Sequence, residues 1–174
     1  MYKFLLRRKI KKILNFSERK KVYHNLKEIK TVLVLFDTEN FADALHFIQQ
    51  LKKMKKKIKA FAYKSKNDTN QYYNISYIAT DKDMKGDSLN QIVKNLTTEK
   101  FDLIVDLTLK ENLLLLYVLV SVEAPLRVGF YRNALSVHDI VISFAPGLVQ
   151  NVKQLGNQLI HYLTIISSDS KSGK

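Results

Sequence analysis

The chain has 174 residues and no cysteine, which excludes a disulfide framework, a cysteine nucleophile and any thiolate metal site. The hydrophobic fraction of 46% is sufficient for one domain with a buried core. The formal net charge of +13 is concentrated at one end, because residues 1–66 carry 19 Lys and Arg against 5 Asp and Glu. Residues 67–174 are almost neutral, and such asymmetry indicates an anionic partner.

The first part of the chain is expected to form basic helices. Apolar side chains recur at helical spacing from Tyr2 to Ile13, so a helix over residues 2–14 is predicted. Ser17 fits the N-cap of a second helix that continues to Glu28. The sequence has neither the apolar region of a secretory signal nor a run long enough to cross a bilayer. We therefore expect a cytoplasmic protein, free or peripheral to the inner membrane or the ribosome.

The body of the chain alternates strand and helix patterns. Residues 31–36 form a continuous apolar run rich in branched side chains, which is typical of a strand buried on both faces of a parallel sheet. The alternation predicts an α/β fold: a Rossmann-like, mainly parallel sheet with helices on both faces, preceded by the basic N-terminal helices. The predicted strands cover residues 31–36, 57–63, 75–79, 101–107, 126–130 and 139–144.

Apolar stripes at three- and four-residue spacing mark the helices between these strands. Residues 37–40, before the clearest stripe, are of the types that cap helices. We divide the chain into a basic extension (1–29), an α/β domain (30–166) and a tail expected to be disordered (167–174). The predicted helices of the domain cover residues 41–54, 89–96, 109–122 and a final segment that opens at Pro146 and Gly147 and ends near 166.

Two segments of the domain resemble a known enzyme family. The strand at 32–36 leads into residues 42–51, ADALHFIQQL, and the strand at 101–107 leads through a helix to residues 124–130, APLRVGF. Together they are similar to the N-terminal domain of the lipopolysaccharide heptosyltransferase family, glycosyltransferase family nine, whose enzymes have the two-domain GT-B fold. The resemblance covers about residues 31–145, in the same order as in the family.

The resemblance implies roles for two residues. Asp43 and His46 fall on the aspartate and histidine of the family motif, and by resemblance Asp43 is the general base that accepts a proton from a sugar hydroxyl. The family's glycine is replaced by Ala42 and its proline by Gln49. The sequence also ends after one domain, whereas the family binds its nucleotide-sugar donor in a second. An alternative interpretation of Asp43 and His46 is a solvated helix flank.

No metal site or cofactor is predicted. Asp37, Glu39 and Asp43 lie where acidic residues stabilise a helix start, and we interpret them in that way. The cluster at 81–87, with three Asp and one Gly, lacks the spacing of a calcium loop and is interpreted as a capped turn. No Gly-rich phosphate-binding motif is present in the sequence.

The N-terminal cations are the second group of candidate residues. Ten Lys and Arg occur within residues 3–27 against one acid, and aromatic residues are interleaved with them. They indicate an anionic partner, with RNA or the ribosome favoured over an acidic membrane because the apolar helix face is narrow and lacks Trp. The residues predicted to bind the anion are Lys3, Arg7, Arg8, Lys9, Lys11, Lys12, Arg19, Lys20 and Lys21.

These observations favour a non-catalytic, basic α/β interaction module that resembles half of a GT-B glycosyltransferase. The alternative is a glycosyltransferase-like subunit that acts on a lipid-linked or saccharide acceptor, with its donor domain supplied by another chain. In that alternative Asp43 is the base, and Arg7 and Arg8 hold the subunit at the membrane.

Overall fold

The computed structural model describes residues 2–65, 68–72, 75–78, 87–130, 137–144 and 151–166. Within these residues the chain forms one sheet in which every paired strand is parallel to its neighbour. The predicted α/β class is therefore confirmed, and the sheet is wholly rather than mainly parallel. The strands are β1 (Thr31–Asp37), β2 (Lys57–Tyr63), β3 (Ser76–Ile78), β4 (Leu103–Asp106), β5 (Leu126–Phe130) and β6 (Ile140–Ile142).

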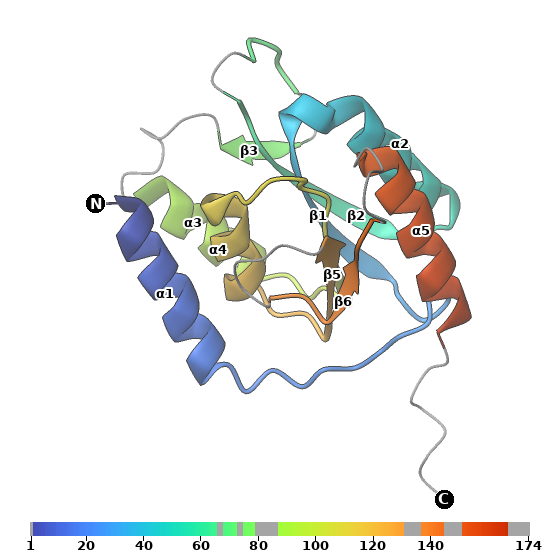
Figure 1. The fold of residues 1–174 in the computed structure, drawn as a ribbon, viewed down its shortest axis with the longest axis horizontal. Coiled ribbons are helices and arrows are strands. Elements are labelled where there is room, and N and C mark those ends of the chain that lie inside the picture. The colour runs from blue at the N-terminus through green and yellow to red at the C-terminus, as the bar shows by residue number, and fades with distance from the viewer. Residues whose placement is uncertain are drawn as a thin grey trace, which may run out of the picture.

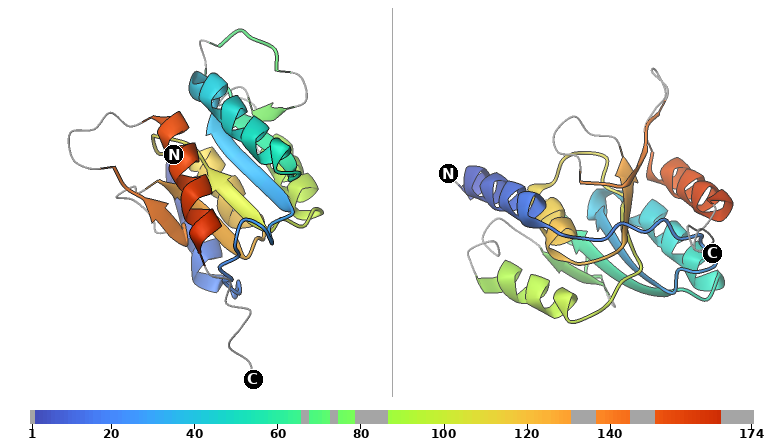
Figure 2. Two further views of the ribbon diagram at one scale, coloured as in Figure 1. Left: turned by 90° about the vertical axis from the view of Figure 1, so that its right-hand side faces the viewer. Right: turned by 90° about the horizontal axis from the view of Figure 1, so that it is seen from below.

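The described helices cover both faces of this sheet. Figure 1 shows α1, α3 and α4 on one side and α2 and α5 on the other, and the two rotated views of Figure 2 agree. The prediction of helices on both faces is confirmed. The helices are α1 (Tyr2–Phe16), α2 (Phe41–Lys53), α3 (Asp87–Thr97), α4 (Leu113–Ser121) and α5 (Val152–Ile165).

The strand order is β3-β2-β1-β4-β5-β6, the Rossmann arrangement. In this order the chain returns past its first strand, so the direction of winding reverses between β1 and β4. β1 is paired with β2 along its whole length and with β4 along residues 32–35. The carboxyl ends of β1 and β4 therefore lie side by side at the position where open α/β sheets bind ligands.

Successive side chains of the central strands enter different cores. Val32, Val34 and Phe36 belong to the cluster beneath α2 and α5, whereas Leu33 and Leu35 belong to the cluster beneath α3 and α4. A strand alternates its side chains between two faces, so a run that is apolar at every position is buried on both. This is why the run at 31–36 indicates its fold from sequence alone.

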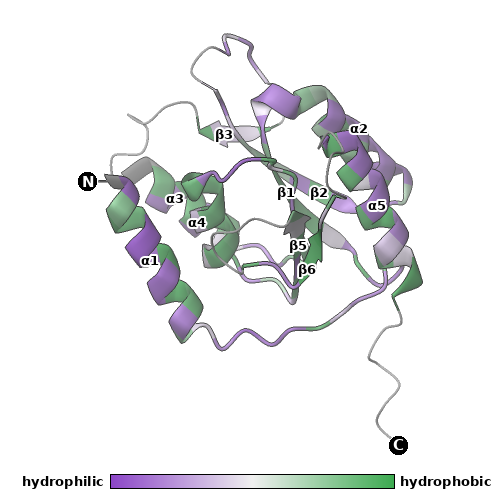
Figure 3. Ribbon diagram, in the orientation of Figure 1, coloured by the Kyte–Doolittle hydropathy of each residue, from purple (hydrophilic) through white to green (hydrophobic). Residues whose placement is uncertain are grey.

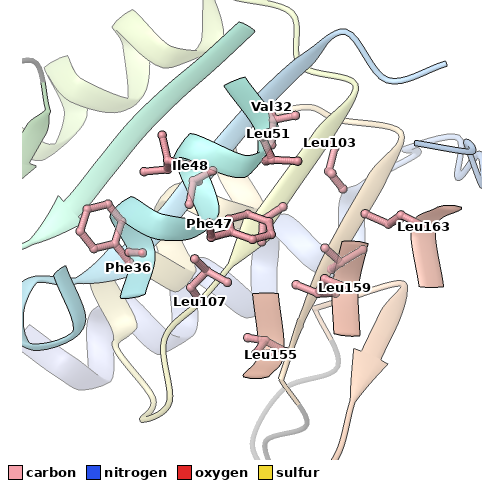
Figure 4. Packing of buried hydrophobic residues seen from close by; sticks show 14 of the residues in the cluster. Val32, Phe36, Phe47, Ile48, Leu51, Leu103, Leu107, Leu155, Leu159 and Leu163 are labelled. Atoms are coloured by element: carbon pink, nitrogen blue, oxygen red, sulfur yellow. The ribbon is translucent and has the colours of Figure 1, made fainter. Parts of the chain in front are cut away.

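The first core is built by α2 and α5 against the sheet. Figure 4 shows Phe47 and Leu51 of α2 facing Leu155 and Leu159 of α5 above the strands. The two helices approach closely at Gly156, where an added Cβ would lie 2.7 Å from Cδ2 of Phe47. Glycine at this position is a packing requirement, because the ring occupies the space of a side chain.

The second core includes the N-terminal helix. Leu6 and Ile10 of α1 are buried in the same cluster as the residues of α4, and Ile13 and Leu14 pack against it. Helix α1 lies along α4, at the outside of the helix layer (Figures 1 and 2). The basic helix is therefore packed on the body of the protein and does not project from it.

The prediction of a second N-terminal helix is wrong. No helix is present between Ser17 and Ile29, and a turn at 26–28 is the only local structure there. The backbone instead bonds to distant segments: the amide of Val22 donates to the carbonyl of Pro125 at 3.1 Å, and that of Leu26 donates to Leu163 at 2.8 Å. These non-local bonds satisfy the same donors that a helix would have used.

Capping also differs from expectation. Asp37 and Asn40 occupy N-cap positions of a short 3-10 turn (Thr38–Asn40) and of α2, yet neither side chain makes a capping hydrogen bond. The predicted helix at 109–122 begins only at Leu113, because the Asn112 side chain accepts hydrogen bonds from the amides of Leu114 and Leu115. The Asp cluster within 81–86, the Pro146–Gly147 start of the last helix and the tail at 167–174 lie outside the described residues.

Candidate functional site

The predicted anion-binding residues lie on α1 and on the segment that follows it. Figure 3 shows hydrophilic and hydrophobic stretches alternating along α1, as expected for a helix with one packed face. Eight of the nine predicted cations are exposed, and Arg19 is the exception. Its side chain is only 11% exposed.

Three of the nine cations are paired with carboxylates of the domain. Arg7 contacts Glu111, although the Arg7 side chain as a whole remains about half exposed. Arg19 contacts Asp139 at 2.6 Å, and Nζ of the exposed Lys21 lies 3.4 Å from the same carboxylate. The positive charges of these three residues are therefore at least partly neutralised by carboxylates of the same chain.

The other six cations make no ion pair within the part of the chain that the structure describes. Five of them are on α1, which contains no acidic residue, and the sixth follows it by four residues. Because the apolar face of α1 is packed against α4, these charges occupy the remaining, solvent-facing surface. They are Lys3, Arg8, Lys9, Lys11, Lys12 and Lys20.

Arg19 has a structural environment that its neighbours lack. Its Nη1 donates to the carbonyls of Ala124 and Pro125 at 3.1 and 2.9 Å, and its Nη2 donates to Asp139. Burial acts to raise the pKa of Asp139, but hydrogen bonds from Arg19 and from the Arg127 amide outweigh it, so that pKa is lowered. Arg19 thus ties the chain after α1 to the strands β5 and β6.

The two residues singled out by the family resemblance lie on α2. Asp43 is half-buried in the first turn of the helix, and His46 is exposed three residues later. The first turn of α2 follows the carboxyl end of β1, so Asp43 lies at the edge of the sheet that such folds use for ligands. Among the described residues no hydrogen bond or ion pair joins Asp43 to His46, and their assignment stays a prediction.

A polar cluster not predicted from the sequence lies at the carboxyl ends of β1, β4 and β5. The Asn112 amide donates to Asp37, the last residue of β1, at 3.0 Å. Asp106, the last residue of β4, accepts from the hydroxyl of Thr108 at 2.6 Å and lies 3.1 Å from Nε2 of His138. The sequence gives one sign of this cluster, which is that Asp106 ends an otherwise apolar strand.

The buried part of this cluster is structural. The side chains of Asp106 and His138 are 1% and 4% exposed, so solvent and solutes do not reach them. A buried carboxylate must be hydrogen-bonded to be tolerated, and His138 and Thr108 provide those bonds. The imidazole fills the space above Gly129, where an added Cβ would lie 2.6 Å from Nε2. Asp106 and His138 therefore fix one another and join β4 to the segment before β6.

A second polar group stands at the carboxyl ends of β1 and β2. Hydrogen bonds from Thr38 and Tyr72 lower the pKa of Asp68 to about 2. Burial raises the pKa of Tyr72, and its bond to Asp68 raises it further. The ring of Tyr72 lies 4.5 Å from that of Phe41, so it also contacts the start of α2. These contacts hold the loop after β2 against α2.

An open groove of about 1010 Å³ lies at the opposite, amino-terminal edge of the sheet. Arg127 lines it but is itself buried, and its Nη2 donates to the carbonyls of Val120 and Val122 at 3.3 and 3.1 Å. The pKa of Arg127 is lowered to about 10, mainly by burial and to a smaller extent by repulsion from Arg19. Arg127 is therefore still protonated at neutral pH. A cation here satisfies the last carbonyls of α4 and suits the negative end of that helix.

Among the described residues, no group of three or more His, Asp or Glu side chains is arranged to hold a metal ion. None of the described helices is both long and apolar enough to span a membrane.

Comparison with known proteins supports the fold and identifies a family. A search of curated proteins finds no match. Among solved structures, an exopolyphosphatase-related protein from Bacteroides fragilis is similar, with a TM-score of 0.52 and 12% identity. The similarity covers 79% of this chain but only 41% of that protein, and at this identity it shows a shared fold alone. The similar structure is not a glycosyltransferase, so the expected resemblance to that enzyme family is not supported. Residues 3–166 match the family of unknown function DUF6913, and the chain belongs to that family.

Proposed function

We propose that the protein is a non-catalytic α/β module that docks on an anionic partner through the outer face of α1. The observation that carries this proposal is a group of six cations on and just after one acid-free helix, none of which has a carboxylate partner within the described segments. The inner side of the helix is packed against the domain, so the charges are held in a fixed arrangement. A fixed positive face attracts polyanions and increases the rate of association with them.

Most cations of this face lack acidic neighbours among the described residues. Exposed cations that stabilise the fold are expected to have acidic neighbours, as Arg7 has Glu111. Arg8, Lys9 and Lys12 have none among the described residues. Their mutual repulsion disfavours the folded state slightly, and an anionic partner removes this cost.

The experiment compares two variants that lose the same charge. Arg8→Ser/Lys11→Ser/Lys12→Ser removes three cations from α1, and Lys52→Ser/Lys53→Ser/Lys55→Ser removes three exposed cations at the end of α2. On immobilised heparin, the α1 variant should elute at clearly lower salt than the wild type, and the α2 variant should elute close to it. Equal shifts in the two variants would show that net charge alone causes retention and would refute the proposal.

Deletion of the N-terminal segment is unsuitable as a test. Leu6, Ile10 and Leu26 are buried in the two cores, so a truncated chain would lose packing as well as charge. Substitutions on the exposed face avoid this difficulty, because surface changes without partners rarely alter stability by more than about 0.5 kcal/mol.

One observation bears on the alternative of a glycosyltransferase-like subunit. Asp43 lies at the ligand-binding edge of the sheet, where a base for an acceptor hydroxyl would have to be. In that case Asp43→Asn should abolish sugar transfer in the complex with a donor domain and leave the melting temperature unchanged. If no nucleotide sugar or partner domain alters the melting temperature of the wild type, the alternative fails.

A further inference from the structure

The outer face of α1 carries exposed apolar side chains among its cations. Phe4 and Phe16 are 69% and 77% exposed, and Leu5 is 50% exposed. Three of the eight large apolar side chains that are exposed in the described part of the chain therefore lie on this one helix. Exposure of these apolar side chains to water is unfavourable. Their position among cations therefore indicates a partner that can bury apolar groups and neutralise positive charge at once.

The four central residues of this face form a row. Phe4, Arg8, Lys12 and Phe16 follow one another at four-residue intervals, so each is one helical turn beyond the last. The rise of an α-helix separates the two Phe residues by about 18 Å. Leu6 and Ile10, on the other side of the helix, are buried against the α4 layer, so the row faces outward.

We infer that the anionic partner is a phospholipid membrane, on whose surface α1 lies with Phe4, Leu5 and Phe16 at the acyl boundary and its cations at the phosphates. This inference rests on the proposed function and specifies the partner. A flat bilayer surface contacts both ends of the row at once. Helix α1 lies at the edge of the molecule in Figure 1 and in the right-hand view of Figure 2, with no other described element outside it.

A membrane accounts for more of this face than RNA does. Both partners would neutralise Arg8 and Lys12, and a base can stack on a Phe ring. Stacking leaves the aliphatic Leu5 without a partner, whereas an interfacial helix buries aliphatic and aromatic side chains alike. The absence of acidic residues from α1 also removes repulsion from anionic headgroups.

The two kinds of contact have different signatures. Each cation near an anionic bilayer improves binding by about fivefold, so loss of two weakens it by about thirtyfold at low salt. Each ring inserted at the acyl boundary contributes about tenfold, and salt does not screen that contribution. Binding should therefore fall with salt to a residual level that depends on Phe4 and Phe16.

The test uses the full chain with sedimentation of vesicles made of phosphatidylcholine alone or with phosphatidylglycerol added. The variants are Phe4→Ser/Phe16→Ser and Arg8→Ser/Lys12→Ser. Their matched controls, on α5 and α2, are Tyr162→Ser/Ile165→Ser and Lys52→Ser/Lys53→Ser, at positions that are likewise exposed. Circular dichroism of each variant shows whether its fold is retained.

The expected result is much tighter binding to vesicles that contain phosphatidylglycerol than to phosphatidylcholine alone, where only the apolar contribution remains. The Phe variant should lose about a hundredfold of this affinity at low and at high salt alike, because it loses two unscreened contributions of about tenfold each, and both controls should stay within twofold of the wild type. Unchanged binding of the Phe variant would overturn the inference. Binding to oligouridylate but not to vesicles would overturn it and leave the proposed function standing, whereas binding to neither and no retention on heparin would refute both.

Discussion

Replacement of Arg19 by alanine should destabilise the protein far more than replacement of its neighbour Lys20. The Arg19 guanidinium donates to Asp139 at 2.6 Å and to two backbone carbonyls before β5. The Asp139 side chain also accepts from the Arg127 amide at 2.8 Å and is almost fully buried. Arg19→Ala therefore leaves a buried carboxylate without its principal partner.

The magnitude follows from burial. The two side chains are 11% and 1% exposed, so water screens their interaction only weakly. Removing one member of a buried pair costs about 3–5 kcal/mol, and the nearby ammonium of Lys21 compensates part of this loss, which places Arg19→Ala near the lower limit. In a domain of this size a loss of about 3 kcal/mol lowers the melting temperature by about 6–12 °C.

Urea denaturation at neutral pH measures the effect. Lys20→Ala removes the same charge from an exposed side chain with no ion pair among the described residues, and should change the free energy of unfolding by less than about 0.5 kcal/mol. Equal stabilities of the two variants would refute the structural assignment of Arg19 and leave it among the cations predicted to bind an anion.

The same pair predicts a dependence on pH. Burial alone would raise the pKa of Asp139, but its hydrogen bonds and the charge of Arg19 lower it below the value in the unfolded chain. A lowered folded-state pKa contributes stability above the unfolded pKa, and this contribution is lost as pH falls through the folded pKa. The stability difference between the wild type and Arg19→Ala should therefore narrow in acid, and a difference that widens there would contradict the reasoning.

Three further substitutions test the packing. Gly129→Ala should cost about 1–3 kcal/mol by forcing a Cβ against His138, and the cost should shrink in a His138→Ala background, as a double-mutant cycle by denaturation would show. Gly156→Ala should lower the melting temperature, because the new Cβ would press on the ring of Phe47, even though Ala favours an exposed helix over Gly. A higher melting temperature would contradict the close approach of α5 to Phe47. Ile10→Ala should lower the free energy of unfolding by about 2–5 kcal/mol. A loss of less than about 1 kcal/mol would mean that α1 is not part of the core.

Much of the fold could be predicted from the sequence because local pattern and tertiary environment agree. The apolar run at 31–36 becomes the central strand, and the stripe from Phe41 becomes a helix whose apolar side is buried. Where the prediction failed, the decisive contact was non-local. Donors between Ser17 and Ile29 bond to segments more than a hundred residues away, which no helical pattern reveals.

The site was predicted less completely than the fold, for a related reason. A run of cations is visible in the sequence, but which of them are free depends on where carboxylates lie after folding. Arg19 and Lys20 are adjacent and alike in sequence, yet only Arg19 meets Asp139. The pairing of Asp106 with His138 is equally invisible, because 32 residues separate them along the chain.

The segment between α1 and β1 fixes the position of α1 on the domain. Nζ of Lys56 donates to the carbonyls of Leu26 and Ile29, both at 2.6 Å, and the Asn25 amide donates to two carbonyls at the end of α5. Together with the bonds of Arg19, these bonds anchor the connector to the residues before β2, β5 and β6 and to the end of α5. The cations of α1 are therefore not on a flexible tail, and a partner does not have to order them upon binding. A partner that fits is one whose anionic surface matches a rigid row of side chains, which favours an extended planar surface over a short flexible polyanion.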